Sequence, residues 1–250
     1  MIVERAEHPE WLSNAYLVAE GPGGSGVLVD GNGVVGPLLE RIESDGIAIT
    51  HVILTHHHVD HVVDTAMYRE RFGVPVVAHE LTAPDLPDDG RADEWIGDGD
   101  TLRSGDLEIR AIHTPGHAAG HIALLFGESD CLTADVLFRG TVGGTRAPGA
   151  TGFDDLRASV MDRLMSLPAE TRVHPGHREA TTVGEEWEAN AFVRVWRGLD
   201  PEGTESCRVG PEETEATLVL WAPDYDGTNK AWVRFHSGEQ AIVGGSQVQR

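Results

Sequence analysis

Four histidines and one aspartate crowd into six residues of this chain, in the run HHHVDH that begins at His56. The run follows directly on residues 51–55, HVILT, an apolar stretch of strand length. Imidazole nitrogens and carboxylate oxygens are ligands that zinc and other divalent metals accept. Alternate residues of an extended loop point the same way, so His56 and His58 would face one ion, and Asp60 and His61 a second. The run therefore predicts two metal sites at the end of a strand.

Two metal sites need more donors than this run supplies, and three later motifs offer them. His117 stands in TPGH, Asp135 in TADVLF and His177 in HPGH, each just past a short apolar run. Ligands gather at the edge of a sheet-based site where strands end, so we expect these three residues to complete the ligand set. His57 points away in the alternating pattern and is not expected to be a ligand.

Strand and helix patterns alternate through most of the chain, which favours a layered α/β body. The strand-like runs are residues 14–19, 26–30, 51–55, 74–78, 107–113, 122–126, 131–134 and 171–174. The helical patterns are residues 34–44, 62–72, 156–166 and 185–196. A glycine-rich loop spans residues 140–152.

The C-terminal part has a different character. Residues 199–213 are acidic and rich in glycine and proline, which predicts a linker. Three strand-like runs follow, at residues 216–221, 230–235 and 240–243, and predict a small antiparallel meander. We therefore expect a main domain over residues 1–198 and an extension over residues 199–250.

Composition narrows the range of partners. The chain has 19 Lys and Arg against 41 Asp and Glu, a formal net charge of −22, and this negative potential repels nucleic acids and anionic membranes. The sequence shows neither a signal-peptide pattern nor an apolar run of membrane-spanning length, so we expect no membrane partner and a cytoplasmic location. Cys131 and Cys207 lie in no metal-binding spacing and are expected to be buried free thiols.

Together the motifs resemble those of the metallo-β-lactamase superfamily. THHHVDH matches its T-H-x-H-x-D-H signature, and TPGHAAGH, TADVLF and HPGH match its later motifs in the same order. Over residues 2–196 the chain is most similar to the glyoxalase II-like (hydroxyacylglutathione hydrolase-like) members. The resemblance implies a four-layer αββα sandwich with the metals at one edge between two sheets, here followed by the small C-terminal antiparallel β extension.

The resemblance also implies a role for each motif residue. His56, His58 and His117 should bind the first metal, Asp60, His61 and His177 the second, and Asp135 should bridge the two. Asp60 is also the expected catalytic residue, because it would orient the nucleophile. Ala134 stands where the family usually has glycine, and GGTRAPG replaces its more usual GRTDLPG, but neither change removes a ligand.

The implied reaction is hydrolysis of a thioester, ester or lactone by a hydroxide shared between two divalent ions. Zinc is the expected metal, with iron or manganese as alternatives, and the expected partner is a small acyl substrate. Arg139 and Arg146, near the glycine-rich loop, are the candidates for binding a substrate carboxylate. The β extension would cap the site or form the contact of a homodimer.

Two other functions compete with this one. A persulfide dioxygenase of the same superfamily shares the H-x-H-x-D-H motif, uses a single iron, and often has PAHDY where this chain has HPGHRE. A non-catalytic module that only binds metal is the second alternative, and the complete ligand set disfavours it.

Overall fold

The computed structural model describes residues 1–250, the side chain of Asp89 excepted. The chain divides into two compact units. The first comprises Met1–His113, Gly120–Ala134 and Gly176–Arg178, and the second Thr114–Ala119, Asp135–Pro175 and Glu179–Arg250. The domain boundary expected after residue 198 stays a prediction.

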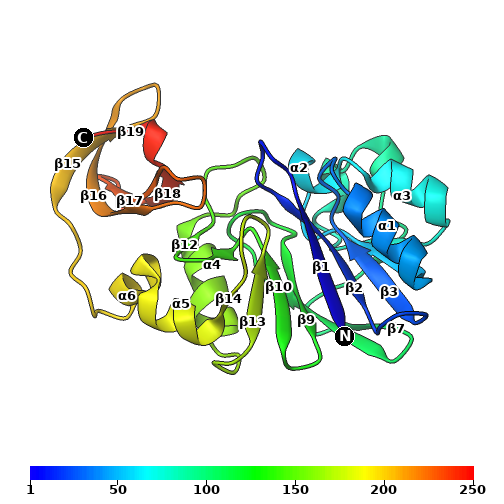
Figure 1. The fold of residues 1–250 in the computed structure, drawn as a ribbon. Coiled ribbons are helices and arrows are strands. Elements are labelled where there is room, and N and C mark those ends of the chain that lie inside the picture. Colours follow the sequence, from blue (N-terminus) through cyan, green and yellow to red (C-terminus); the bar gives the residue numbers. More distant parts are fainter. The chain divides into compact units, whose positions relative to one another are not determined.

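A six-stranded sheet forms the centre of the first unit (Figure 1). In spatial order its strands are β1 (Ile2–Glu7), β2 (Asn14–Ala19), β3 (Ser25–Val29), β4 (Ala48–Ile53), β5 (Val76–Ala78) and β6 (Glu94–Trp95). The first three strands pair antiparallel, and β3 to β6 pair parallel. The parallel strands bring their carboxyl ends to one edge, so the loop after β4 leaves the sheet there.

Helices cover one face of this sheet (Figure 1). They are α1 (Gly36–Asp45), α2 (Val59–Val62) and α3 (Thr65–Phe72), with short 3-10 turns at η1 (Ala83–Asp85) and η2 (Asp88–Gly90). The helix predicted over residues 62–72 corresponds to α3, which begins at Thr65 and ends at Phe72, before the C-cap Gly73 with its left-handed φ of 63°. Leu38 of α1 and Tyr68 of α3 pack with Leu17 of β2 in one buried cluster.

Four antiparallel strands pack against the opposite face of the sheet. They are β7 (Thr101–Ser104), β8 (Leu107–His113), β9 (Ile122–Phe126) and β10 (Asp130–Ala134). Tyr16 and Val18 of β2 pack with Ile109 of β8 and Leu124 of β9 in a second buried cluster. Because neighbouring residues of a strand point to opposite faces, β2 is buried on both sides, as its continuous apolar run NAYLVA indicates.

The second unit contains the remaining helices and short strands. They are β11 (Leu137–Phe138), β12 (Thr141–Val142), α4 (Phe153–Ala158), the π-helix η3 (Ser159–Leu164), β13 (Arg172–Pro175), β14 (Thr181–Thr182), α5 (Val183–Ala189) and α6 (Ala191–Trp196). The helix predicted over residues 185–196 breaks at Asn190, whose side chain accepts hydrogen bonds from the backbone N–H groups of Phe192 and Val193 and so caps α6.

A five-stranded antiparallel sheet, here called the C-terminal sheet, completes the second unit. Its spatial order is β18 (Gln240–Gly244), β17 (Asn229–Phe235), β16 (Thr214–Pro223), β15 (Glu205–Val209) and β19 (Val248–Gln249), with a 3-10 turn at η4 (Gly245–Gln247). The predicted meander therefore corresponds to β16, β17 and β18. The predicted linker contains a strand, because β15 pairs along β16 and buries Cys207 and Val209 in the sheet's own core.

Among the described residues, none of the helices combines the length and the apolar character that a membrane crossing requires.

Candidate metal centre

The loop after β4 places its histidines within a few residues of the sheet edge. His56 is fully buried, and His58 is the residue from which α2 begins. Asp60 and His61 lie in the first turns of α2, and His61 is also fully buried. The rings of His56 and His58 are 4.7 Å apart, and those of His56 and His61 are 4.5 Å apart. The sequence run thus folds into one compact imidazole cluster.

Three of the predicted ligands form a close group in the first unit. The ligand atoms of Asp60, His61 and His177 lie within 4.8 Å of one another. Nε2 of His61 and Nε2 of His177 are each 3.6 Å from Oδ2 of Asp60. Two ring nitrogens therefore converge on one carboxylate oxygen, which is the donor set expected for the second metal.

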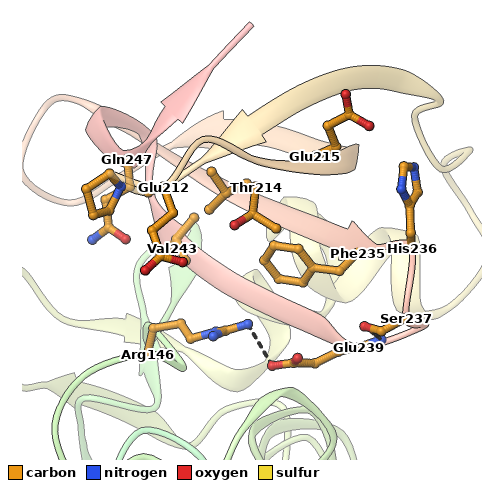
Figure 2. Close-up of a pocket in the computed structure, with 13 residues that line it drawn as sticks. Arg146, Glu212, Thr214, Glu215, Phe235, His236, Ser237, Glu239, Val243 and Gln247 are labelled. Carbon is orange, nitrogen blue, oxygen red and sulfur yellow. Dashed lines mark hydrogen bonds and ion pairs between the residues drawn. The ribbon is translucent and has the colours of Figure 1, made fainter.

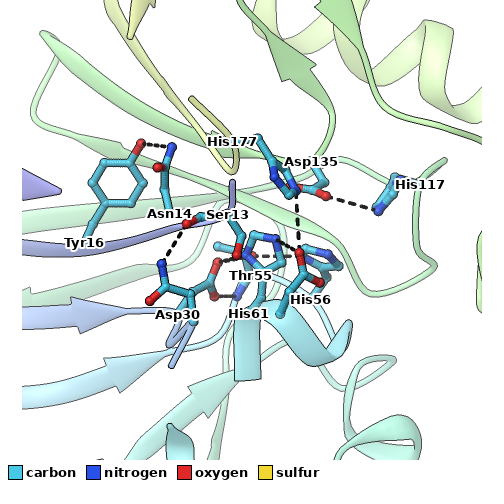
Figure 3. Close-up of polar contacts among 12 residues, drawn as sticks. Ser13, Asn14, Tyr16, Asp30, Thr55, His56, His61, His117, Asp135 and His177 are labelled. Carbon is cyan, nitrogen blue, oxygen red and sulfur yellow. Dashed lines mark hydrogen bonds and ion pairs between the residues drawn. The ribbon is translucent and has the colours of Figure 1, made fainter. Parts of the chain in front are cut away.

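Asp30, a residue that the sequence analysis missed, holds this cluster from the side away from Asp60. Its Oδ2 lies 3.0 Å from Nδ1 of His61 and accepts a hydrogen bond of 2.7 Å from the Thr55 hydroxyl (Figure 3). Oγ1 of Thr55 in turn lies 3.0 Å from Nδ1 of His56. Since the hydroxyl proton goes to Asp30, the Thr55 oxygen accepts from His56. Both rings are thus protonated on Nδ1 and keep the Nε2 lone pair for a metal.

A signal for Asp30 was present in the sequence. It follows the buried strand β3 and precedes Gly31, at the same sheet edge from which the histidine loop leaves. Its φ of 58° is unusual for a residue other than glycine, and its Oδ1 accepts a 2.8 Å hydrogen bond from the Thr55 backbone. A carboxylate directly after a buried strand is therefore a candidate partner for ligands on the neighbouring strand.

His177 is held by a backbone carbonyl. Its Nδ1 lies 3.1 Å from the carbonyl oxygen of Trp11, so that nitrogen carries the proton and Nε2 faces Asp60. The preceding residue is fixed on both sides, because the Gly176 N–H donates to Ala134 and its carbonyl accepts from the Asn14 N–H. The short segment that carries His177 is therefore tied into the first unit.

The second unit contains the two remaining predicted ligands, His117 and Asp135. Nε2 of His117 lies 3.5 Å from Oδ2 of Asp135 (Figure 3). Nδ1 of His117 lies 2.9 Å from the Gly144 carbonyl oxygen. The pattern is the same as at His61 and His177, with Nδ1 on an acceptor and Nε2 beside a carboxylate. Both side chains are buried.

The backbone before Asp135 is strained at one departure from the family motif. Ala134, which stands where the family usually has glycine, has a φ of 40°. Left-handed backbone costs a residue with a Cβ about 1–2 kcal/mol, and glycine avoids that cost. Ala134 therefore holds a backbone conformation that glycine would adopt without this cost.

Other histidines and the first cysteine also have defined surroundings. Nδ1 of His57 lies 4.0 Å from the Asp85 carboxylate. His121 is buried with its ring 5.2 Å from that of His56. Cys131 is buried in β10, and burial raises the pKa of its thiol to about 12, so it is not an activated nucleophile.

The C-terminal sheet forms a cleft of about 640 Å³ that contains one of the two predicted substrate arginines (Figure 2). Arg146 pairs with Glu239 at 2.6 Å, and its guanidinium lies 5.0 Å from the centre of the Phe235 ring. Arg139 is exposed. Arg146 thus already has a carboxylate partner, and none of the predicted metal ligands is among the lining residues. The substrate role of both arginines stays a prediction.

Known proteins match most of this chain. The family model described as Metallo-beta-lactamase superfamily matches residues 8–177. The hydroxyacylglutathione hydrolase of Rhizobium meliloti is 34% identical over 197 residues, which cover 78% of this chain and 71% of that protein.

Solved structures agree with that match. ETHE1 from Myxococcus xanthus is 30% identical, with a TM-score of 0.70 over 77% of this chain and 84% of that one. A protein described as TTHA1623 in a di-iron-bound form is 35% identical, with a TM-score of 0.65 over 77% of this chain and 100% of that one. Residues 178–250 lie outside the family match.

Proposed function

The chain belongs to the metallo-beta-lactamase superfamily and has its fold, and from that membership we propose that it is a dinuclear metal-dependent hydrolase of thioesters, esters or lactones. One observation carries the proposal. Four buried imidazoles, those of His56, His61, His117 and His177, each have Nδ1 against an oxygen acceptor. This arrangement leaves Nε2 of each ring available as a ligand atom.

The donor set suits two divalent cations. Imidazole nitrogen with carboxylate oxygen is the combination that zinc, iron and manganese accept, and soft thiolate ligands are absent from the groups described. We assign His56, His58 and His117 to one metal, Asp60, His61 and His177 to the other, and Asp135 to both. The order of the motifs in the chain supports this assignment, and the family relative described as di-iron-bound supports a site for two metals. The identity of the metal, with zinc as our choice, is part of the proposal.

Two bound divalent ions would lower the pKa of a shared water and polarise a substrate carbonyl. The chain's own residues contribute orientation. Asp60 faces Nε2 of both His61 and His177, and its carboxylate can also accept a hydrogen bond from the attacking water, which would fix the direction of attack. Asp30, through His61 and Thr55, prevents the imidazole rings from turning away.

The proposed substrate is a small acyl compound. The similarity to proteins named hydroxyacylglutathione hydrolase supports a thioester, whereas the β-rich C-terminal sheet gives no reason to expect glutathione itself. A cytoplasmic location and a homodimer are further parts of the proposal.

Metal analysis combined with a substrate panel tests the proposal. The purified full chain should contain close to two metal ions and should hydrolyse at least one member of a panel of acyl thioesters, esters and lactones. His58→Ala should lose both metal and turnover. The half-buried residue His51 of β4, outside the ligand set, gives a matched control, because His51→Ala should retain both. Full turnover in a chelated, metal-free sample would rule out the proposed mechanism.

Metal analysis and the substrate panel, together with a measurement of oxygen uptake, separate the two competing functions. A single iron per chain together with oxygen uptake on a persulfide would favour the dioxygenase. Two metals without turnover on any compound of the panel would favour a module that only binds metal.

A further inference from the structure

A short loop in the second unit touches both predicted ligands of that unit. The Gly144 carbonyl accepts the Nδ1 proton of His117. Gly143 packs so closely that a Cβ placed on it would lie 2.0 Å from the Asp135 carbonyl oxygen and 3.4 Å from Nδ1 of His117. The backbone of these two glycines is therefore the surface against which His117 and Asp135 rest, and any shift of the loop would move them.

The C-terminal sheet fixes the loop immediately after these glycines. The Thr145 N–H donates to the Ile242 carbonyl of β18 at 2.9 Å, and the Ile242 N–H donates to the Thr145 hydroxyl oxygen at 2.8 Å. Both residues are buried. Two hydrogen bonds between residues far apart in the chain thus join β18 to the position next to Gly144.

The same sheet fixes the loop immediately before the glycines. Lys230 of β17 is buried, and its Nζ donates to the Val142 carbonyl at 2.8 Å while pairing with the Asp224 carboxylate at 3.1 Å. Its ammonium also lies 5.3 Å and 5.1 Å from the ring centres of Phe138 and Tyr225. Burial of an ammonium is costly unless hydrogen bonds and an opposite charge compensate it. One of those hydrogen bonds goes to a carbonyl of the glycine-rich loop.

We propose that the C-terminal sheet positions the metal ligand His117, with Thr145 and Lys230 as the positioning residues. The sheet holds the loop at Val142 and at Thr145, so that the Gly144 carbonyl between them keeps the His117 ring in place. The inference rests on the proposed function, because it takes His117 as a ligand. It goes beyond the family pattern, because Lys230 and Ile242 lie outside residues 8–177 that the family model matches.

Cobalt binding to the metal-free full chain tests the role of Thr145. Co²⁺ alone is titrated into wild type, and the binding step lost in His117→Ala identifies the site. Thr145→Val removes the hydroxyl that Ile242 needs, so it should weaken that step about tenfold and change its visible absorption spectrum, as loss of outer-shell support does in metal sites. Thr145→Ser keeps the hydroxyl and should restore both affinity and spectrum.

A control on the same sheet separates positioning from general damage. Thr217→Val makes the same substitution on β16 and should leave the affinity and the spectrum unchanged. Wild-type binding in Thr145→Val, failure of Thr145→Ser to rescue, or equal weakening in Thr217→Val would each overturn the inference. If wild type and His117→Ala bind Co²⁺ alike, so that no binding step depends on His117, the proposed function is overturned instead.

Lys230 provides a second, independent test. Lys230→Met alone would leave the Asp224 carboxylate buried without its cation, so the informative comparison is Lys230→Met/Asp224→Asn against Asp224→Asn. The double variant should bind Co²⁺ more weakly at the His117 step than the single variant. Equal binding by the two would remove Lys230 from the proposal.

Discussion

His61 in the first unit and His117 in the second are both predicted ligands, and they are held in different ways. Nδ1 of His61 rests on the Asp30 carboxylate, which also receives two hydrogen bonds from Thr55. Nδ1 of His117 rests on a neutral carbonyl, that of Gly144. A hydrogen bond to a charged acceptor is roughly twice as strong as one between neutral groups.

The two ligands therefore obtain their rigidity from different parts of the molecule. Asp30 follows β3, a central strand, so His61 is fixed by the core of its own unit. Gly144 lies in a glycine-rich loop, so the weaker acceptor at His117 depends on the C-terminal sheet for its position. Charge stabilises one ligand, and added packing stabilises the other.

Removal of the Asp30 carboxylate should have the largest effect. Asp30→Ala leaves the Thr55 N–H and hydroxyl and the His61 Nδ1–H without this acceptor in a buried site. The free energy of unfolding should fall by roughly 3–5 kcal/mol, and metal affinity by about 10–100-fold. Denaturant unfolding and metal titration measure the two effects.

Asp64 provides the control for that variant. Its carboxylate accepts a 2.6 Å hydrogen bond from the Gly33 backbone, a residue outside the ligand set. Asp64→Ala should therefore lower stability without weakening metal binding. Equal loss of metal in both variants would show that the carboxylate support at His61 is not specific.

Substitutions of Gly143 and Gly144 test the support of His117, the ligand that rests on a neutral carbonyl. Gly143→Ala would drive a Cβ against the Asp135 carbonyl oxygen, whereas a Cβ on Gly144 meets only the Ile242 carbonyl oxygen at 3.6 Å, an ordinary contact. We expect Gly143→Ala to lower the free energy of unfolding by about 3 kcal/mol and to weaken metal binding. Gly144→Ala should be neutral or raise stability by about 0.5 kcal/mol. Similar thermal melting of both variants would contradict the close contact.

The strained alanine before Asp135 offers a smaller effect of opposite sign. Ala134→Gly relieves a φ of 40° and should raise the free energy of unfolding by about 0.5–1 kcal/mol. Ala123→Gly, in the extended strand β9, is the matched control and should lower it. A loss of stability in Ala134→Gly as large as that in Ala123→Gly would show that the turn is not strained.

The smallest expected effect concerns a buried histidine that lacks the carboxylate support of His61. Nδ1 of His79 accepts a hydrogen bond from the Leu81 N–H, and burial, followed by the nearby His113, lowers the pKa of His79 from its ordinary 6.5. Below pH 6.5 the unfolded chain binds a proton that the folded chain does not, so stability should fall as the pH falls.

His79→Gln should remove part of that acid-induced loss. Chemical denaturation of the metal-free protein across a pH series measures it, since metal binding itself depends on pH. The exposed His236 gives the control variant His236→Gln, whose pH dependence should match wild type. An unchanged slope in His79→Gln would mean that another group governs the acid response.

Much of the fold and family followed from local sequence patterns. The HHHVDH run, the apolar strand before it and the three later motifs led to the metallo-β-lactamase superfamily and its fold, and the family match confirms both. Local signals also located β2, β3 and β9 to within a residue or two. Asn190 is a signal for the break between α5 and α6, because asparagine is a preferred N-cap. The apolar periodicity on both sides of Asn190 instead favoured one continuous helix.

The position of Asp30 after a buried strand was readable, but the pairing of each support with its ligand was not, for a physical reason. Asp30 meets His61 across 31 residues, and Thr145 meets Ile242 across 97, through a sheet whose pairing no local pattern specifies. Strand β15 was predicted as a linker because its acidic, glycine-rich flanks outweigh five residues of strand. The ligand assignments themselves stay predictions.

The burial of Lys230 gives the molecule a built-in chemical probe. It is the one lysine of the chain, and its amine is enclosed by Phe138, Tyr225 and Asp224. An acylating reagent reaches that amine only when this enclosure opens, so the rate at which Lys230 is modified reports how often the C-terminal sheet exposes it. The growth with time of the mass shift that this modification causes therefore measures the rate of local opening around Lys230.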